Sequence, residues 1–244
     1  MKRNLMIILL IVSALSIVFV SCKKKKDSKD NSQVVWYSPE PGPNGTVPEV
    51  VLPDYIEDSV TTYITIPTGV NPPAINGEFL SHPHVLIHST IDNDTITVYN
   101  DRYVAFYSAN YTDDDYVDFY GKQWDDEQGE FYQEVFRKLY VLGTGEDFTC
   151  YYLTEGYPND LYAKQATVFS GKWDESYGGL RDFQVAVILL ETSGNPNLAE
   201  PGSFRVLGDG DGLAQDTAWL SGKRTVSENV SVSAEDAFSM FRIR

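Results

Sequence analysis

Basic residues are scarce in this sequence. Lys and Arg together number 19 against 35 Asp and Glu, and the formal net charge is −16. The acidic excess is concentrated in the main part of the chain, because five of the lysines lie within residues 22–31. Nucleic-acid binding needs Lys and Arg to neutralise phosphates. The composition therefore excludes nucleic acid as a partner.

Catalytic motifs are missing as well. The sequence has no G-x-S-x-G, P-loop, H-E-x-x-H or C-x-x-C pattern. Two of the many Asp and Glu side chains could form the carboxylate pair of a glycosidase, but their spacing along the chain selects no pair. The sequence therefore favours a non-catalytic protein, and an envelope hydrolase is the alternative.

Only one long apolar run occurs, from Leu5 to Val20, and its 16 residues fall short of the ~20 that a membrane-spanning helix needs. Two basic residues precede the run, and Cys22 follows it after a small serine. This order predicts a bacterial lipoprotein signal peptide over residues 1–21, with Cys22 as the lipidated first residue of the mature protein. The alternative is an uncleaved anchor, because the lysines after Cys22 could act as a stop-transfer flank.

Lipidation at Cys22 predicts where the protein is located. Two or more acyl chains anchor a protein stably, so we expect an outer-membrane lipoprotein of the bacterial cell envelope, facing the periplasm or the cell surface. The lysines at positions 23–26 would then lie near anionic headgroups. Lipidation also leaves Cys150 as the one other cysteine, so no intramolecular disulfide can form.

The mature chain divides into a tether and a domain. Residues 22–50 are rich first in lysine and then in proline and glycine, a composition that stays extended and cannot bury a core. Residues 51–244 are long enough for one β domain. The segment from Pro53 to Tyr63 predicts a helical turn with acidic residues near its start.

The domain consists mainly of strand-like segments that are rich in Tyr, Val, Thr, Phe and Ile and are separated by Gly, Asn and Asp. Short strands at this spacing predict an all-β fold, with a single antiparallel β-barrel preferred to a β-sandwich. In the segment Phe148–Tyr152, alternation places Cys150 inward as a buried thiol. The expected strands are 77–80, 85–90, 95–100, 103–110, 116–124, 130–142, 147–154, 163–170, 183–192, 202–207, 218–221 and 237–243.

The three histidines fall within seven residues, at His82, His84 and His88. Alternate residues of a strand share a face, so all three are expected on one face. His82 and His84 could chelate a divalent metal such as Zn²⁺, whereas His88 lies four strand residues beyond His84, about 13 Å away. The alternative is a polar strand face that holds no metal.

A second metal candidate is the segment Gly208–Gly212, in which Asp209 and Asp211 alternate with glycine. The segment resembles the start of a calcium loop, but Ala214 stands where an EF-hand needs its glycine. A tight turn is therefore the main prediction. Calcium bound by Asp209, Asp211 and Asp216 is the alternative.

Aromatic residues are abundant, with 16 Tyr, 12 Phe and 4 Trp. Most are needed for the core, because a β domain without disulfides depends on apolar burial. An exposed aromatic platform would stack on sugars, and a pocket at a barrel mouth would hold a small apolar molecule. The leading functional prediction is non-catalytic binding of a glycan or a small apolar ligand. A structural or adhesive accessory of an outer-membrane complex is the alternative, and the oligomeric state is left open.

Three strings carry a resemblance to known proteins. Gly69-Val-Asn-Pro-Pro-Ala-Ile-Asn-Gly77, Gly202-Ser-Phe-Arg-Val-Leu-Gly-Asp-Gly-Asp-Gly212 and the Ser21-Cys22-Lys23 junction resemble uncharacterised secreted lipoproteins of Bacteroidetes-type bacteria, a resemblance that implies no activity. The stretch Ile75-Asn-Gly-Glu-Phe79 is similar to the first strand of lipocalin-like barrels, in which a glycine precedes an aromatic residue that closes the barrel floor. Phe79 stands where Trp is usual. This second resemblance implies a β-barrel and assigns no functional residues.

Overall fold

The computed structural model describes residues 34–108, 115–125, 130–219 and 233–242. Cys22, the predicted signal peptide and the lysine-rich part of the tether lie outside these ranges. Within the described ranges, no helix is long and apolar enough to cross a membrane.

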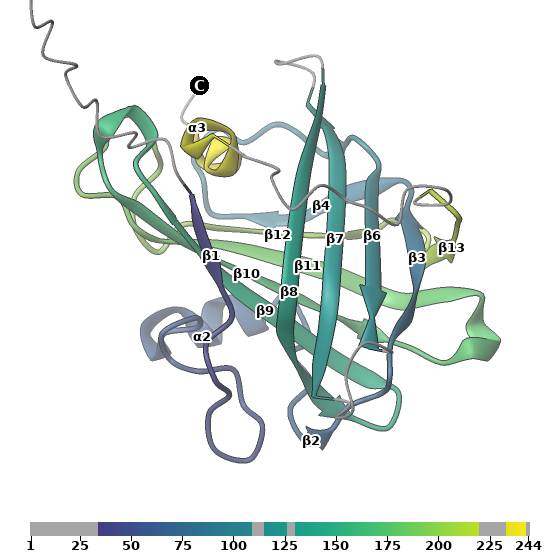
Figure 1. Cartoon of the computed structure of the whole chain (residues 1–244). Helices are drawn as coiled ribbons and strands as arrows, with labels where there is room; N and C mark the ends of the chain where they lie inside the picture. Colours follow the sequence, from purple (N-terminus) through teal and green to yellow (C-terminus); the bar gives the residue numbers. More distant parts are fainter. Residues whose placement is uncertain (1–33, 109–114, 126–129, 220–232, 243–244) are drawn as a thin grey trace, which may run out of the picture. The chain divides into compact units, whose positions relative to one another are not determined.

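The centre of the fold is a closed antiparallel barrel of eight strands (Figure 1). Each strand pairs with the next around the ring, and the ring closes because β13 joins β11 to β3. The prediction of an all-β fold with a single antiparallel barrel is therefore confirmed. In order around the ring, the strands are β3 (Asn76–Ser81), β6 (Arg102–Tyr107), β7 (Tyr116–Asp125), β8 (Glu130–Thr144), β9 (Asp147–Gly156), β10 (Ala163–Lys172), β11 (Gly179–Glu191) and β13 (Leu213–Asp216).

Five further strands extend this ring. One group continues outward from β11, in the order β12 (Phe204–Asp209), β4 (His84–Ser89) and β5 (Val98–Tyr99). Two others add to single barrel strands, namely β1 (Val35–Tyr37) on β9 and β2 (Val70–Asn71) on the end of β8. The helical elements are α2 (Asp54–Thr61), α3 (Ala234–Ala237) and three 3₁₀ turns, η2 (Pro158–Asp160), η3 (Glu175–Tyr177) and η4 (Ser239–Phe241).

Alternation along the strands separates the barrel interior from its outer face. In β9, Phe148, Cys150 and Tyr152 belong to the interior cluster, whereas Tyr151 and Leu153 belong to the outer one. The predicted inward position of Cys150 is therefore confirmed, and burial raises the pKa of its thiol. A thiol with a raised pKa stays protonated at neutral pH and is a poor nucleophile.

Phenylalanine rings fill part of the interior. Phe169 is fully buried, and its ring centroid lies 4.8 Å from that of Phe119 and 6.2 Å from those of Phe106 and Phe183. Nearby, Phe79 meets Trp173 edge to face at 5.2 Å. Tilted and edge-to-face pairs of this kind stabilise a core beyond their buried area. The interior is thus held by aromatic packing, in a domain whose one cysteine is unpaired.

The helix α2 packs against the outer face of the barrel (Figure 1). Its buried residues Ile56 and Val60 join Leu153 of β9, Val168 of β10 and Ile188 of β11 in one apolar cluster. These two helix positions are four residues apart, so they lie on the same side of the helix. The predicted helical turn over residues 53–63 is confirmed.

The prediction of an extended tether is wrong for residues 35–50. Val35–Tyr37 form β1 on β9, and Trp36 packs against the interior cluster. The Tyr37 hydroxyl donates to Glu155 Oε1 at 2.6 Å. The apolar and aromatic residues before the prolines form this strand, because such side chains favour a half-buried sheet. The folded domain therefore begins before residue 51.

The last two expected strands are also wrong. In place of the strand at 237–243 the chain forms α3 and η4, because Ser233 caps the helix by accepting from the Asp236 amide at 3.1 Å. Phe238 and Phe241, three residues apart, then reach the interior cluster. Residues 218–219 form no strand, since the sheet uses Leu213–Asp216 directly after the glycine-rich turn. Residues 220–221 of that expected strand lie outside the described ranges.

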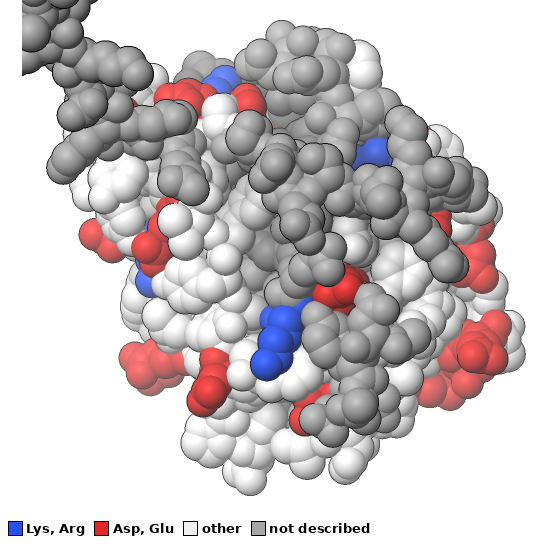
Figure 2. Space-filling model, viewed as in Figure 1, with Lys and Arg blue, Asp and Glu red and all other residues white. Residues whose placement is uncertain are grey.

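Figure 2 shows Asp and Glu side chains spread around the margin of one face of the domain, with few Lys or Arg among them. The acidic excess of the sequence is thus dispersed over this face. Charge that is dispersed in this way acts through the overall field of the protein and defines no single acidic site.

Candidate functional site

A cavity of about 520 Å³ lies at one end of the barrel. The loop between β4 and β5, the inner faces of β9 to β12 and the segment from Asp236 to Arg242 enclose it, together with residues at the ends of β4, β5, β6 and β7. Its volume falls within the range of about 300–1,000 Å³ that is typical of small-molecule sites.

The strands supply apolar walls to this cavity. Tyr152 of β9, Val185 and Val187 of β11 and Leu207 of β12 line it, and all four belong to the interior cluster. Met240 packs against the same cluster from the C-terminal segment. Since paired strands hold most of these side chains, the walls are fixed before any ligand arrives.

A buried ion pair lies in the cavity wall. Arg205 Nε of β12 lies 2.6 Å from Asp94 Oδ2 in the loop, and their side chains are 8% and 3% exposed. Burial raises the pKa of Asp94, but hydrogen bonds from Arg205 and Ser89 and the Arg205 charge outweigh it, so the pKa lies below its ordinary value. Asp94 is therefore ionised at neutral pH, and the pair carries no net charge.

Gln165 of β10 contributes a second buried polar group. Its Nε2 donates to the carbonyl oxygen of Ala237 at 2.9 Å, which ties β10 to the C-terminal segment. Its Oε1 is buried and has no hydrogen-bond partner among the described residues. The residue is 4% exposed and lines the cavity. A buried acceptor without a partner is uncommon in folded proteins and calls for an explanation.

Comparison with known proteins identifies no relative of this chain. No family model, curated protein or solved structure matches the chain. Any function assigned to the chain therefore depends on its own residues, and above all on those of the cavity.

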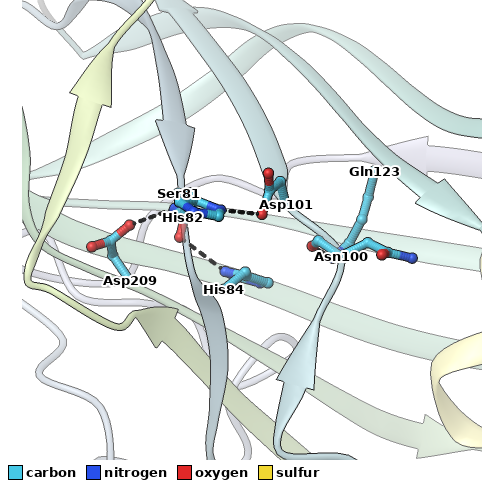
Figure 3. A network of polar contacts seen from close by, with 7 residues as sticks. All are labelled: Ser81, His82, His84, Asn100, Asp101, Gln123 and Asp209. Carbon is cyan, nitrogen blue, oxygen red and sulfur yellow. Dashed lines mark hydrogen bonds and ion pairs between the residues drawn. The ribbon is translucent and has the colours of Figure 1, made fainter.

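His84, the first residue of β4, is a titratable group in the cavity lining. It is 2% exposed, lines the cavity, and its Nδ1 lies 3.0 Å from Ser81 Oγ (Figure 3). Burial, assisted by the nearby Arg102 charge, lowers the pKa of His84 to about 3. His84 is therefore neutral at physiological pH and presents an uncharged imidazole to the cavity.

Replacing His84 with glutamine is expected to remove an acid-dependent loss of stability. The folded-state pKa of about 3 lies below the ordinary value of 6.5, so the unfolded chain binds the proton first. The stability due to neutral His84 is complete above pH 6.5 and falls by about 1.4 kcal/mol per pH unit between 6.5 and 3. Denaturant unfolding at pH 7 and pH 5 should therefore show a wild-type loss about 2 kcal/mol larger than that of His84→Gln. Parallel pH profiles for the two proteins would contradict this expectation.

The three histidines do not share a face, so that prediction is wrong. His82 lies in the turn between β3 and β4, where its Nδ1 is 2.6 Å from Asp101 Oδ1 (Figure 3). His84 faces the cavity, whereas His88 stacks on Tyr63 at 3.6 Å between ring centroids, next to Phe204 of the outer cluster. The reason is a register shift in the β4–β12 ladder, which reverses the inward and outward positions between His84 and His88.

Asp209 and Asp211, two of the predicted metal ligands, lie at the turn beside His82, but oxygens of both carboxylates accept backbone hydrogen bonds. Asp209 Oδ2 accepts from the His82 amide at 2.9 Å, and its Oδ1 accepts from the amides of Asp211 and Leu213 at 3.2 and 3.0 Å. The prediction of a tight turn at 208–212 is confirmed. Among the described residues, no group of three or more His, Cys, Asp or Glu is arranged to hold a metal. A divalent metal at His82, His84, Asp209 and Asp211 stays a prediction.

Gln165, Asp94 and Arg205 are not among the residues predicted from the sequence. A signal for Gln165 was available, because it stands at an inward position of β10 between Ala163 and Thr167. A polar residue at an inward position of an apolar strand often marks a site. No local sequence pattern indicates the Asp94–Arg205 ion pair, since its two residues lie 111 positions apart.

Proposed function

We propose that this protein is a lipid-anchored protein of the bacterial envelope that binds a small molecule without transforming it. The observation that carries this proposal is the cavity at one end of the barrel, in which apolar strand side chains stand beside many polar and charged ones. Such a combination is typical of small-molecule sites, because apolar walls provide binding energy and fixed polar groups select the orientation.

Two ionisable groups of the cavity, His84 and Asp94, are poorly suited to acid–base catalysis. A general acid or base needs a pKa close to the working pH. His84 has a pKa of about 3, and the pKa of Asp94 is lowered in its ion pair with Arg205. Neither group gives up or takes a proton readily near pH 7. The envelope-hydrolase alternative therefore gains no support from these residues.

A thermal-shift screen of the purified protein with glycans and fatty acids tests the proposal. A ligand at about 100 times its Kd should stabilise the protein by about 2.7 kcal/mol, and the Tm should rise by roughly 5–10 °C. Val187→Phe, which places a larger side chain in the cavity wall, should abolish that rise. Val70→Phe is the matched control, because Val70 is 63% exposed on β2 and does not line the cavity. An equal rise in the Val187→Phe protein would place binding elsewhere.

Membrane attachment is expected to depend on Cys22. In a fractionated bacterial host, the wild-type protein should appear in the membrane pellet, and Cys22→Ala should appear in the supernatant, because no acyl chain can be attached. Cys150→Ala is the matched control and should stay in the pellet, since Cys150 is buried inside the barrel. A Cys22→Ala protein that remains in the pellet would favour the uncleaved anchor.

A further inference from the structure

The amide of Gln165 offers one acceptor to a ligand. Its orientation is fixed, because Nε2 already donates to Ala237, so Oε1 is the group left without a partner among the described residues. A ligand that donates a hydrogen bond to Oε1 would satisfy this acceptor. A purely apolar ligand would keep it buried and unpaired, which is costly.

Arg205 of β12 offers hydrogen-bond donors to the same cavity. Only its Nε bonds to Asp94, and within the described part of the chain its two terminal nitrogens make no hydrogen bond. Arg205 is 7% exposed and lines the cavity. A guanidinium presents its N–H groups in a fixed fork, which suits a ligand with adjacent oxygen atoms.

The Arg205–Asp94 pair favours an uncharged ligand group beside it, although Arg102, 7% exposed, adds a further guanidinium to the cavity lining. Asp94 neutralises Arg205, and its carboxylate would repel an anionic ligand that approached the guanidinium. A carboxylate ligand such as a fatty acid would therefore meet a paired arginine rather than an isolated cation. Neutral hydroxyl groups both donate and accept, so they match Gln165 and Arg205 together.

Aromatic side chains provide the remaining surface. Trp124, at the end of β7, is 40% exposed and lines the cavity, and Tyr152 lines its inner part. The faces of aromatic rings carry negative charge and attract the polarised C–H groups on the face of a sugar ring. The cavity thus offers hydrogen-bonding groups to the hydroxyls at the edge of a sugar ring and aromatic surface to the face of that ring.

From these observations we propose that the cavity binds a neutral mono- or disaccharide, whose hydroxyl groups donate to Gln165 Oε1 and accept from Arg205. This assignment rests on the proposed function of small-molecule binding, and it selects the glycan over the small apolar ligand. It also makes Gln165, Arg205 and Trp124 binding residues.

Calorimetric titration of the purified full chain tests the assignment. The probes are a panel of neutral mono- and disaccharides, the matching uronic acids, palmitate and anilinonaphthalene sulfonate. At least one neutral sugar should bind, and its uronic acid should bind 10-fold or more weakly. Gln165→Met should weaken sugar binding about 10-fold or more, since the sugar hydroxyl that donates to Gln165 Oε1 loses its acceptor and is left unpaired. Trp124→Ala, at an exposed position that leaves the fold intact, should weaken it to a similar extent.

Gln184→Met is the matched control for Gln165→Met. Gln184 is likewise a hydrogen-bonded glutamine, accepting from the Thr65 amide and donating to the Tyr63 carbonyl, but it does not line the cavity. Sugar binding should be unchanged in this variant. Circular dichroism and melting curves of each variant establish that it is folded.

The outcomes separate this assignment from the function on which it rests. The protein could bind palmitate or the naphthalene dye but no sugar, with an affinity that Gln165→Met leaves unchanged or increases. That result would overturn the saccharide assignment and leave small-molecule binding in place. Sugar binding that survives both Gln165→Met and Trp124→Ala would overturn the assignment of these residues. Failure of every probe to bind the wild-type protein would overturn both proposals.

Discussion

Phe169→Ala is expected to destabilise the domain by about 3–5 kcal/mol, enough to lower the Tm by roughly 6–20 °C. Phe169 is fully buried on β10, and its ring meets those of Phe106, Phe119, Tyr152 and Phe183. Truncation removes the apolar surface of the ring and leaves a cavity that the neighbouring rings cannot fill, because paired strands fix their backbone. The loss is therefore larger than that expected from transfer of the ring alone.

Urea unfolding monitored by circular dichroism measures this loss. Phe169→Leu should cost less, because it leaves a smaller void. Tyr55→Ala is a control at a position that is 68% exposed on α2, and it should change stability by no more than about 0.5 kcal/mol. An unfolding midpoint for Phe169→Ala equal to that of the wild type would show that the barrel interior is loosely packed.

Asp94→Ala is expected to cost about 3–5 kcal/mol, because it leaves the Arg205 guanidinium buried without its counter-charge. The double variant Asp94→Ala with Arg205→Met should recover much of this loss, since no unpaired charge then remains. Denaturant unfolding of the wild type, both single variants and the double variant gives the coupling energy between the two side chains.

An exposed ion pair of the same protein is the control for this experiment. Lys172 Nζ lies 3.9 Å from Asp182 Oδ2, with side chains 46% and 70% exposed. Lys172→Met should cost no more than about 1 kcal/mol, because water screens this pair. A loss for Asp94→Ala no larger than that for Lys172→Met would mean that the Arg205 charge is hydrated through the cavity.

The barrel could be predicted from the sequence because inward and outward side chains alternate along each strand. Alternation at Phe148, Cys150 and Tyr152 gave the inner face of β9 correctly, since the side-chain period of a strand is fixed at two. The same rule failed for His84 and His88, because a register shift in the ladder is set by the partner strand and leaves no mark in the local sequence. The β-branched and aromatic residues of β1 were overlooked beside a lysine- and proline-rich stretch.

The cavity could not be predicted in this way. Gln165, Arg205 and Asp94 come from β10, β12 and the loop between β4 and β5, and only closure of the barrel brings them together. Local sequence indicates which side chains point inward, but it does not indicate which distant strands will face one another. The prediction of a C-terminal strand is wrong because the apolar residues of this segment do not follow a period of two: Phe238 and Phe241 lie three residues apart, and both reach the interior cluster.

The pairing of β3 with β13 also has a kinetic consequence. Strand β3 ends at Ser81 and β13 begins at Leu213, so the ring cannot close until the whole intervening chain has been made. Contacts between such distant segments slow folding, because a long loop must be ordered before they form. Until then the edges of β3 and β11 are open to other strands. We therefore expect slow folding, with aggregation as the competing reaction.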